Sequence, residues 1–292
     1  MATTTDGSNK KVDSKDTVLQ KWAKLQHPER MIPPSLFLSA TETTIAIVDK
    51  FPKAIFHALI FPRTQGNLRE EDLEDLRALL GSHSRVPRER AKELLIAMGE
   101  HARKVRDEIK HDMRVIYKFE WDVWIGFHAV QAMSLVHLHM HVISSDLHNE
   151  RMTDPKQYNS FHPKHGYFLH YDEVMSWFDA APAVFQTKIS GLGSRQYKEI
   201  LEDPLSCYQC TRSFGNMHQL KNHLKAHHMA KYNAALKIYE REKKAAEATK
   251  PPSKASPRAI LLKKRKHDGK PSSVGSRTSR APGSSGPLHG GE

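Results

Sequence analysis

The segment Leu135–Ser144 alternates strongly between polar and apolar residues, and single apolar residues separate His137, His139 and His141. Side chains at every second position lie on the same face of a β-strand. The three imidazoles therefore fall on one face, while the apolar residues between them point toward a core on the other. This pattern predicts a half-buried strand whose polar face is crowded with histidine.

The residues alone leave three uses of such a face open. Neutral imidazoles can ligate a metal such as Zn²⁺. Alternatively, one imidazole can act as a nucleophile while its neighbours fix its tautomer through hydrogen bonds. The third alternative is a solvated polar face without chemistry, because the chain's 19 histidines make a chance cluster easier to reach.

The middle of the chain mixes short strand patterns with amphipathic helix patterns. Apolar and β-branched runs predict strands at Thr44–Val48, Phe56–Phe61, Met113–Phe119 and Asp122–Phe127. Apolar residues at helical spacing predict helices at Thr17–Leu25, Glu70–Leu80 and Arg88–Ile109, and another that begins within Glu173–Phe178. Since strands and helices do not alternate regularly, we expect an α+β fold with an antiparallel sheet and flanking helices.

A second motif has the spacing of a zinc finger. It follows the pattern Cys-x2-Cys-x12-His-x3-His, with the ligands Cys207, Cys210, His223 and His227. Thiolates and imidazoles at this spacing close a tetrahedral Zn²⁺ site. Because the protein fills all four positions, we expect one structural zinc ion in a small ββα C2H2 finger. His228 is an alternative fourth ligand, since a spacing of four residues also occurs.

The finger is expected to have a core of its own, separate from the rest of the chain. Phe214 and Leu220 fall where the small apolar core of such a module needs them. Cys207 and Cys210 are the chain's two cysteines, and they lie too close together in sequence to staple a fold. This excludes a secreted protein built on disulfides and favours a reducing compartment.

The finger also suggests contacts with DNA. If its helix starts near Met217, the base-reading positions are Asn216, Gln219 and Asn222. On the same helix, basic side chains that would meet phosphates are Lys221 and Lys225. The alternative is a finger that only packs on its neighbour or binds protein.

Charge supports a polyanionic partner. The chain has 45 Lys and Arg against 33 Asp and Glu, a net charge of +12. Nine basic and two acidic residues fall in Pro251–Glu292, where Lys263–Lys266 is a continuous basic run. Such a run in a segment rich in Pro, Ser and Gly is typical of a nuclear localisation signal or a nonspecific phosphate contact, and its alternative is a solvated charge run without a role. No apolar run approaches the length of a membrane span.

Composition and motifs together predict a chain of six parts. These are a disordered segment (residues 1–16), a catalytic domain (17–180), a connector (181–204), the finger (205–230), a helical extension (231–248) and a disordered basic tail (249–292).

The histidine strand and the segments upstream of it resemble the histidine triad superfamily of nucleotide hydrolases and transferases. His137–Ile143 fits that family's His-φ-His-φ-His-φ-φ signature, where φ is apolar. Val48–Ala54 and Phe56–Arg63 resemble its paired strands around the nucleotide. Gly126–Ala129 and Asn159–Phe161 resemble one branch, aprataxin, in which a finger of this pattern follows the catalytic domain. The resemblance therefore implies a histidine-triad fold followed by a finger.

The resemblance assigns roles to the histidines. It implies that the middle histidine, His139, is the nucleophile, that His57 and His141 stabilise the phosphates, and that His137 orients the strand. Counting forward from Gly126 would instead make His137 the nucleophile. We follow the count back from the end of the strand, because a loop absorbs a two-residue insertion more easily than a paired strand does.

The resemblance also implies nucleotide and DNA contacts. Asp49 is expected at the ribose, Ser134 at the phosphate because it stands five residues before His139, and Lys53 at the nucleotide. Lys156 is the remaining basic residue of a DNA-contacting segment that is usually rich in lysine.

The function implied is that of a nuclear DNA repair hydrolase. It would remove AMP from 5′-adenylated DNA ends left by abortive ligation, through a covalent histidyl-AMP intermediate, with broken DNA as partner, AMP as product and a monomeric state. One alternative is a nucleic-acid-binding adapter with a degenerate or nucleotide-sensing triad domain. Another is a hydrolase of dinucleoside polyphosphates or nucleoside phosphoramidates.

Overall fold

The computed structural model of the chain describes residues 17–130, 135–193 and 195–249. The chain divides into two units, Met1–Arg241 and Glu242–Glu292. The described part of the second unit is the end of one helix. The segments for which disorder is predicted, 1–16 and almost all of the basic tail, lie outside the described residues, as does the basic run Lys263–Lys266.

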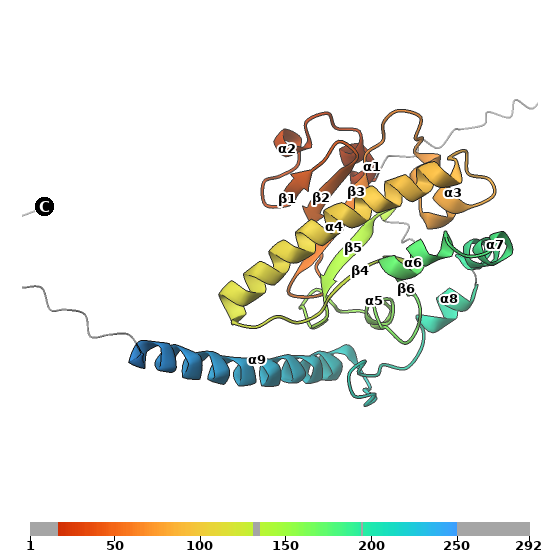
Figure 1. The fold of residues 1–292 in the computed structure, drawn as a ribbon. Helices are drawn as coiled ribbons and strands as arrows, with labels where there is room; N and C mark the ends of the chain where they lie inside the picture. Colours follow the sequence, from red (N-terminus) through yellow and green to blue (C-terminus); the bar gives the residue numbers. More distant parts are fainter. Residues whose placement is uncertain (1–16, 131–134, 194, 250–292) are drawn as a thin grey trace, which may run out of the picture. The chain divides into compact units, whose positions relative to one another are not determined.

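The first unit is built on one antiparallel sheet of six strands (Figure 1). The strands are β1 (Phe37–Ala40), β2 (Thr44–Val48), β3 (His57–Pro62), β4 (Val123–His128), β5 (Met140–Ser144) and β6 (Phe168–His170). Their order in the sheet is β1-β2-β3-β5-β4-β6, and every neighbouring pair is antiparallel. The expected α+β class with an antiparallel sheet is confirmed.

Helices and short turns surround the sheet. In chain order they are α1 (Val18–Ala23), α2 (Pro28–Met31), the 3₁₀ turn η1 (Glu71–Leu73), α3 (Leu76–Leu80), α4 (Arg88–Tyr117), α5 (Pro155–Asn159), α6 (Tyr171–Trp177), α7 (Pro182–Gly191), α8 (Arg195–Ile200) and α9 (Met217–Ala248). No helix among the described residues is both long enough and apolar enough to cross a membrane.

The two faces of the sheet have different partners. Along β3, Ala58 and Ile60 belong to the core beneath the long helix α4, which crosses the sheet diagonally in Figure 1. Leu59 and Phe61 point to the opposite face and pack with α1. His57 has the parity of Leu59 and Phe61, so the alternation of the strand places it on the face opposite α4. Any chemistry of His57 therefore belongs to that second face.

One sequence-based strand prediction is wrong, and a second is wrong in part. Met113–Phe119 is not a strand, because α4 continues to Tyr117 and ends where Lys118 adopts a left-handed conformation with φ of 62°. Buried Met113 extends the apolar stripe of the helix by one more turn beyond Ile109. The histidine strand also starts later than Leu135, since β5 begins at Met140.

The residues just before β5 pair with a turn instead of a strand. The backbone N–H of Leu138 donates to the carbonyl oxygen of Leu73 in η1, at 2.6 Å. Leu138 itself is buried in the core beneath α4, as the alternation predicts. The interval 181–204, expected to be a connector, contains α7 and α8, and Phe185 of α7 is buried in the same core.

Candidate functional site

A pocket of about 350 Å³ opens on the face of the sheet opposite α4. Its polar and charged lining residues are Asp49, Lys53, His57, His128, His139, His141, Lys156, Gln157 and Ser160. Four imidazoles thus share one pocket, contributed by β3, β4, β5 and the residue just before β5. Site residues predicted from three separate segments line this pocket: Asp49, Lys53 and His57 from the first, His139 and His141 from the second, and Lys156 from the third.

Three side chains of the pocket lie in a row. The carboxylate Oδ2 of Asp49 lies 3.2 Å from Nδ1 of His57. Nε2 of His57 lies 2.9 Å from Nδ1 of His141. The backbone N–H of Lys53 donates to Nδ1 of His57, at 3.2 Å. Nδ1 therefore carries a lone pair, and the neutral ring of His57 holds its proton on Nε2.

This proton position fixes the next tautomer. Nε2 of His57 is then a donor, so Nδ1 of His141 accepts and His141 carries its proton on Nε2. The Nε2 atoms of His128 and His141 are both buried, and neither has a hydrogen-bond partner among the described residues. Buried polar atoms of this kind call for a ligand or water, so the pocket is suited to a polar group such as a phosphoryl oxygen.

The tautomer of His139 is fixed by its own backbone. Nδ1 of His139 lies 2.8 Å from the carbonyl oxygen of His137. A carbonyl can only accept, so Nδ1 carries the proton and the lone pair is on Nε2. Burial lowers the pKa of His139 below its usual value of 6.5. The ring is therefore neutral at physiological pH, which is the form a nucleophile needs.

His137 occupies a different environment from His139 and His141. It is fully buried, does not line the pocket, and its Nε2 lies 2.8 Å from the carbonyl oxygen of Pro62. Its ring meets that of Phe61 edge-on, with the ring centroids 6.0 Å apart. His137 thus lies outside the pocket, although its ring packs against Phe61 on the face opposite α4, and the chain is not yet in a β-strand at that residue.

Burial dominates the electrostatics of the remaining imidazoles. It lowers the pKa of His57 to about 4, although Asp49 opposes the shift. It lowers the pKa of His128 to about 3, with repulsion from His139 and His57 adding to the effect. The pKa of His141 is also well below 6.5, for burial first and then repulsion by His128. All of these groups are neutral at pH 7.

Sequence reasoning does not assign a role to two residues of this pocket. His128 belongs to the segment Gly126–Ala129, and its ring lies 4.4 Å from that of His141 between centroids. Phe161 packs against the rings of His57, His128 and His141, at 5.6, 4.6 and 5.2 Å. The signal in the sequence for His128 is a histidine at the end of a predicted strand that directly precedes the triad strand.

The lysines at this pocket differ in environment. Burial lowers the pKa of Lys53, and its Nζ donates to the carbonyl oxygen of Phe51 at 2.6 Å. Lys156 lines the pocket from α5, where its Nζ is 2.6 Å from a carboxylate oxygen of Glu202. Ser134, expected at the phosphate, lies outside the described residues.

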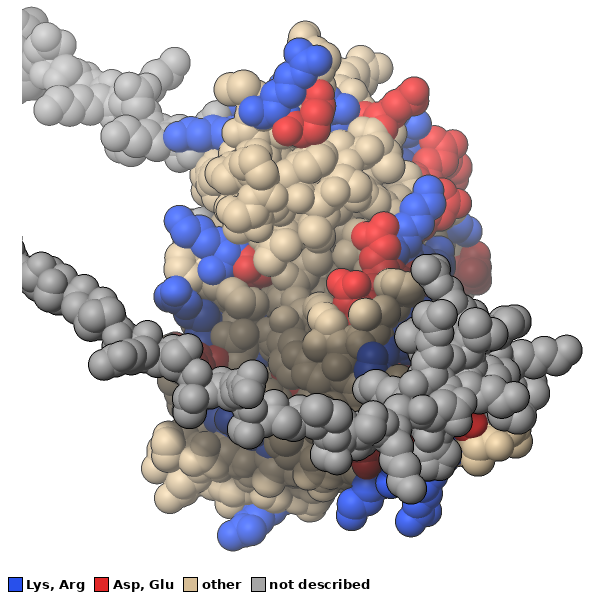
Figure 2. Space-filling view, turned by 90° about the vertical axis from the view of Figure 1, so that its left-hand side faces the viewer, with Lys and Arg blue, Asp and Glu red and all other residues tan. Residues whose placement is uncertain are grey.

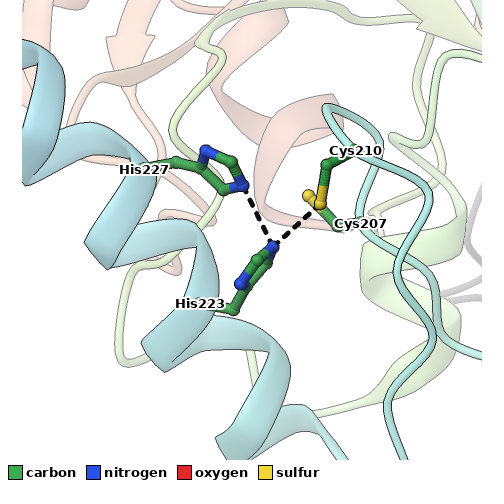
Figure 3. A group of neighbouring side chains, drawn as sticks. All are labelled: Cys207, Cys210, His223 and His227. Atoms are coloured by element: carbon green, nitrogen blue, oxygen red, sulfur yellow. Dashed lines mark hydrogen bonds between the residues drawn. The ribbon is translucent and has the colours of Figure 1, made fainter.

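The four expected zinc ligands converge at the start of α9 (Figure 3). The ligand atoms of Cys207, Cys210, His223 and His227 all lie within 4.8 Å of one another. Nε2 of His223 is 3.1 Å from Sγ of Cys210 and 3.0 Å from Nε2 of His227. Ligands about 2.0–2.3 Å from a tetrahedral ion lie at comparable separations from one another. The donor set and its spacing therefore fit Zn²⁺.

His228 does not join this cluster. It is buried and its ring packs edge-on against Trp121, with centroids 4.6 Å apart. Phe119 and Tyr117 surround it further, at 5.6 and 6.1 Å. The geometry therefore favours His227 as fourth ligand and gives His228 a packing role.

The expected DNA-reading residues of the finger are mostly exposed, and some are already bonded. Oδ1 of Asn216 accepts from the backbone N–H of Gln219 at 3.0 Å, so Asn216 caps the start of α9. Asn222 bonds His218 at 3.0 Å, and Nζ of Lys221 donates to the carbonyl oxygen of Glu150 at 3.3 Å. Exposed Lys225, by contrast, has no hydrogen bond or ion pair among the described residues.

Comparisons with known proteins cover both parts of the chain. Two family profiles match: one, described as scavenger mRNA decapping enzyme C-term binding, over residues 16–157, and one, described as a C2HE / C2H2 / C2HC zinc-binding finger, over residues 164–229. Aprataxin of Danio rerio is 30% identical over 194 residues, 66% of this chain and 50% of that protein. The chain is therefore similar to aprataxins over about 66% of its length.

Other relatives extend this result. An aprataxin-like protein of Saccharomyces cerevisiae is 28% identical over 195 residues, which are 61% of this chain and 81% of the yeast protein. The chain spans about half the length of the vertebrate aprataxins it matches. Among solved structures, Hnt3 in complex with DNA and guanosine superposes with a TM-score of 0.51 at 19% identity, covering 75% of this chain and 96% of that one. The likeness confirms the fold.

The part of the first unit that is built on the six-stranded sheet, here called the histidine domain, carries the pocket with the four imidazoles, here called the histidine pocket. The finger and the histidine domain share one apolar core, so the expectation of separate cores is wrong. Finger residues and histidine-domain residues form one buried cluster: Ala54, Ile143, Leu147, Met152, Tyr158, Phe161, Phe168, Leu205, Cys207, Met217, Leu220 and Leu224. Tyr158 of α5 donates its hydroxyl to the carbonyl oxygen of Ser206 at 2.8 Å and accepts from the N–H of Tyr208 at 3.1 Å. Phe161, a wall of the histidine pocket, therefore belongs to the same core as a zinc ligand.

Proposed function

We propose that this protein hydrolyses 5′-adenylated DNA, releasing AMP and a DNA end with its 5′-phosphate. The observation that carries the proposal is the neutral His139, whose Nδ1 is bonded to the carbonyl oxygen of His137 within a pocket of further neutral imidazoles. Aprataxin relatives and a solved relative described with DNA and guanosine support DNA as the substrate class.

In the first step, Nε2 of His139 attacks the phosphorus of AMP. A P–N bond forms, and the bond between that phosphorus and the oxygen bridging to the DNA 5′-phosphate breaks. The leaving group is a phosphate, so it needs little protonation. Donors and cations around the pocket, chiefly Lys53 and the N–H at Nε2 of His141, would offset the charge on the phosphoryl oxygens.

In the second step, water attacks the phosphorus of the histidyl-AMP. The P–N bond breaks, AMP leaves, and neutral His139 is regenerated. The proton of that water passes to solvent, and the N–H at Nε2 of His141 is suited to donate to a phosphoryl oxygen. Asp49 and Ser134 remain the proposed contacts to ribose and phosphate.

The finger would hold one structural Zn²⁺ through Cys207, Cys210, His223 and His227. When bound, the ion crosslinks the turn that follows α8 to the start of α9, and its four protein ligands leave no open position for chemistry. Gln219, Asn222 and Lys225 on the exposed side of α9 are the proposed DNA contacts. The basic run Lys263–Lys266 is the proposed signal for the nucleus, which deletion of residues 249–292 would test by imaging.

The deciding experiment compares two substrates at equal concentration. One is a 5′-adenylated nicked duplex, and the other is a free adenosine phosphoramidate. The proposal predicts a kcat/KM at least about 100-fold higher on the adenylated DNA, since the finger and basic residues add binding only there. Turnover of the phosphoramidate alone would indicate a small-nucleotide hydrolase, and turnover of neither would indicate a binding adapter.

A further inference from the structure

A second and larger cavity lies away from the histidine pocket. It has a volume of about 550 Å³ and is formed by η1, α3, the loop that follows α3, and α7. None of its lining residues lines the histidine pocket. Cavities of about 300–1,000 Å³ are typical of small-ligand sites in proteins, so this volume is large enough for several phosphate groups.

A buried carboxylate organises one wall of this cavity. Asp72 of η1 is 6% exposed and accepts two backbone hydrogen bonds, from the N–H of Arg69 at 3.3 Å and from the N–H of Arg85 at 3.4 Å. The two arginines are far apart in sequence, yet one carboxylate fixes both of their backbones. Among the described residues, no ion pair joins the Asp72 carboxylate to either guanidinium group.

Three arginines therefore bring their charge to the cavity without a carboxylate partner. Arg69, Arg77 and Arg85 line it and are exposed, and none of the three guanidinium groups makes an ion pair or hydrogen bond among the described residues. Glu71 and Asp72 are the two acids in the lining. By comparison, the exposed Arg195 pairs with Glu199 at 3.1 Å.

The chemistry of this lining is that of a phosphate site. Guanidinium forks bind phosphate oxygens in a bidentate manner, and the hydroxyls of Ser82, Ser84 and Ser190 add donors. Among the described residues, no Phe, Tyr or Trp lines the cavity on which a base could stack. Figure 2 shows a different face, on the side of Figure 1 away from α3 and α7. Basic and acidic side chains are interspersed there around a broad uncharged area.

We infer that this cavity is a second phosphate-binding site, and that its ligand is the backbone of a nucleic-acid strand outside the histidine pocket. The lack of a Phe, Tyr or Trp in the described lining favours a strand's phosphates over a whole nucleotide. The inference does not require adenylate hydrolysis, because it concerns binding of nucleic acid that carries no adenylate.

Two triple variants of the full chain test it. The cavity variant is Arg69→Ala/Arg77→Ala/Arg85→Ala. The control is Arg90→Ala/Arg106→Ala/Arg195→Ala, which removes the same charge from paired arginines outside the cavity.

Binding of a fluorescent, non-adenylated single-stranded oligonucleotide is measured by anisotropy over a range of salt. The cavity variant should bind at least about tenfold more weakly than the control. Its slope of log K against log salt should be shallower by about 2, because each phosphate that the protein neutralises on a single strand contributes about 0.7 to that slope.

Calorimetry with tripolyphosphate separates the two sources of phosphate. If the cavity variant alone fails to bind tripolyphosphate while its oligonucleotide binding equals that of the control, the phosphate site stands and a nucleic-acid strand is overturned as its ligand. If both ligands bind the cavity variant as they bind the control, the inference is overturned. Arg77→Glu, which leaves the Asp72 hydrogen bonds in place, repeats the test should the triple variant fail to fold.

Discussion

His139 donates its Nδ1 proton to the carbonyl oxygen of His137, with 2.8 Å between the two heavy atoms. One residue of the triad thus orients the next through its backbone, while its own ring is turned to Pro62. His137 and His139, which the sequence pattern makes equivalent, thus have different environments. This difference supports His139 as the nucleophile, and replacing each side chain in turn tests it.

His139→Ala should abolish AMP release, with kcat reduced at least about 10³-fold, because no other group replaces the attacking nitrogen. Affinity for adenylated DNA should stay near that of the wild type, since a nucleophile adds little to ground-state binding. Mass spectrometry should find no protein–AMP adduct. His137→Ala should keep the adduct but lower the melting temperature, because it removes a buried ring. The reverse pattern would make His137 the nucleophile.

Asp49→Asn should lower kcat for adenylated DNA by about 10²-fold, because an amide cannot stabilise a positive charge on His57 or His141. The pH profile of kcat should change shape, because the carboxylate of Asp49 raises the pKa of His57 against the effect of burial. Lys53→Met is the matched control, since the Lys53 side chain lines the same pocket outside the row of Asp49, His57 and His141. Lys53→Met should raise KM and leave the pH profile of kcat unchanged. A raised KM with an unchanged profile in Asp49→Asn would limit Asp49 to substrate binding.

Zinc chelation, or Cys210→Ser, should reduce turnover of a small adenylate as well as of adenylated DNA. The reason is the shared core: metal drives folding of the finger, and Cys207 packs in the same cluster as Phe161 of the histidine pocket. The melting temperature of the whole first unit should fall in calorimetry.

Lys225→Ala is the control for this experiment, because its side chain is exposed on the same finger. It should weaken DNA binding several-fold and leave turnover of the small adenylate unchanged. Full activity on the small adenylate after zinc removal would show that the histidine domain folds without the finger.

Local patterns were sufficient to predict much of this fold. The strand Thr44–Val48 is found as predicted, because each of its residues belongs to a paired, mostly buried strand whose apolar, β-branched run is visible in the sequence. The ligand spacing of the finger needed no tertiary information. The mixing of strands and helices was enough to indicate an antiparallel sheet.

The errors arise where distant segments decide the structure. Val115 and Ile116 resemble strand residues, but they are exposed on the last turn of α4, whose buried side is set by packing on the sheet. The strand starts only after His137, because the backbone of Leu138 pairs with Leu73 of η1, a distant segment that no local pattern reveals as a partner. The union of the two cores depends likewise on Tyr158, whose partner is in the finger.

The stability of the protein should fall as the pH drops below about 6.5. Burial lowers the pKa of His128 from 6.5 to about 3 in the folded chain. Between these values the unfolded chain binds a proton that the folded chain does not, so the free energy of unfolding decreases with decreasing pH. His57 and His137, whose pKa values are both lowered to about 4, act in the same direction. Urea unfolding at several pH values from 7.5 to about 4.5 measures the slope.

Replacing His128 isolates one part of that slope. His128→Gln removes one titrating group, so near pH 5 the free energy of unfolding should depend less steeply on pH, by about 1.4 kcal/mol per pH unit. The absolute stability can fall as well, because glutamine fills the buried site poorly, but a packing loss does not change the slope. His83→Gln, in the exposed loop after α3, is the control and should reproduce the wild-type slope. Equal slopes in all three proteins would mean that His128 is protonated in the folded state at pH 5, and the pocket would then hold a charged imidazole instead of a neutral one.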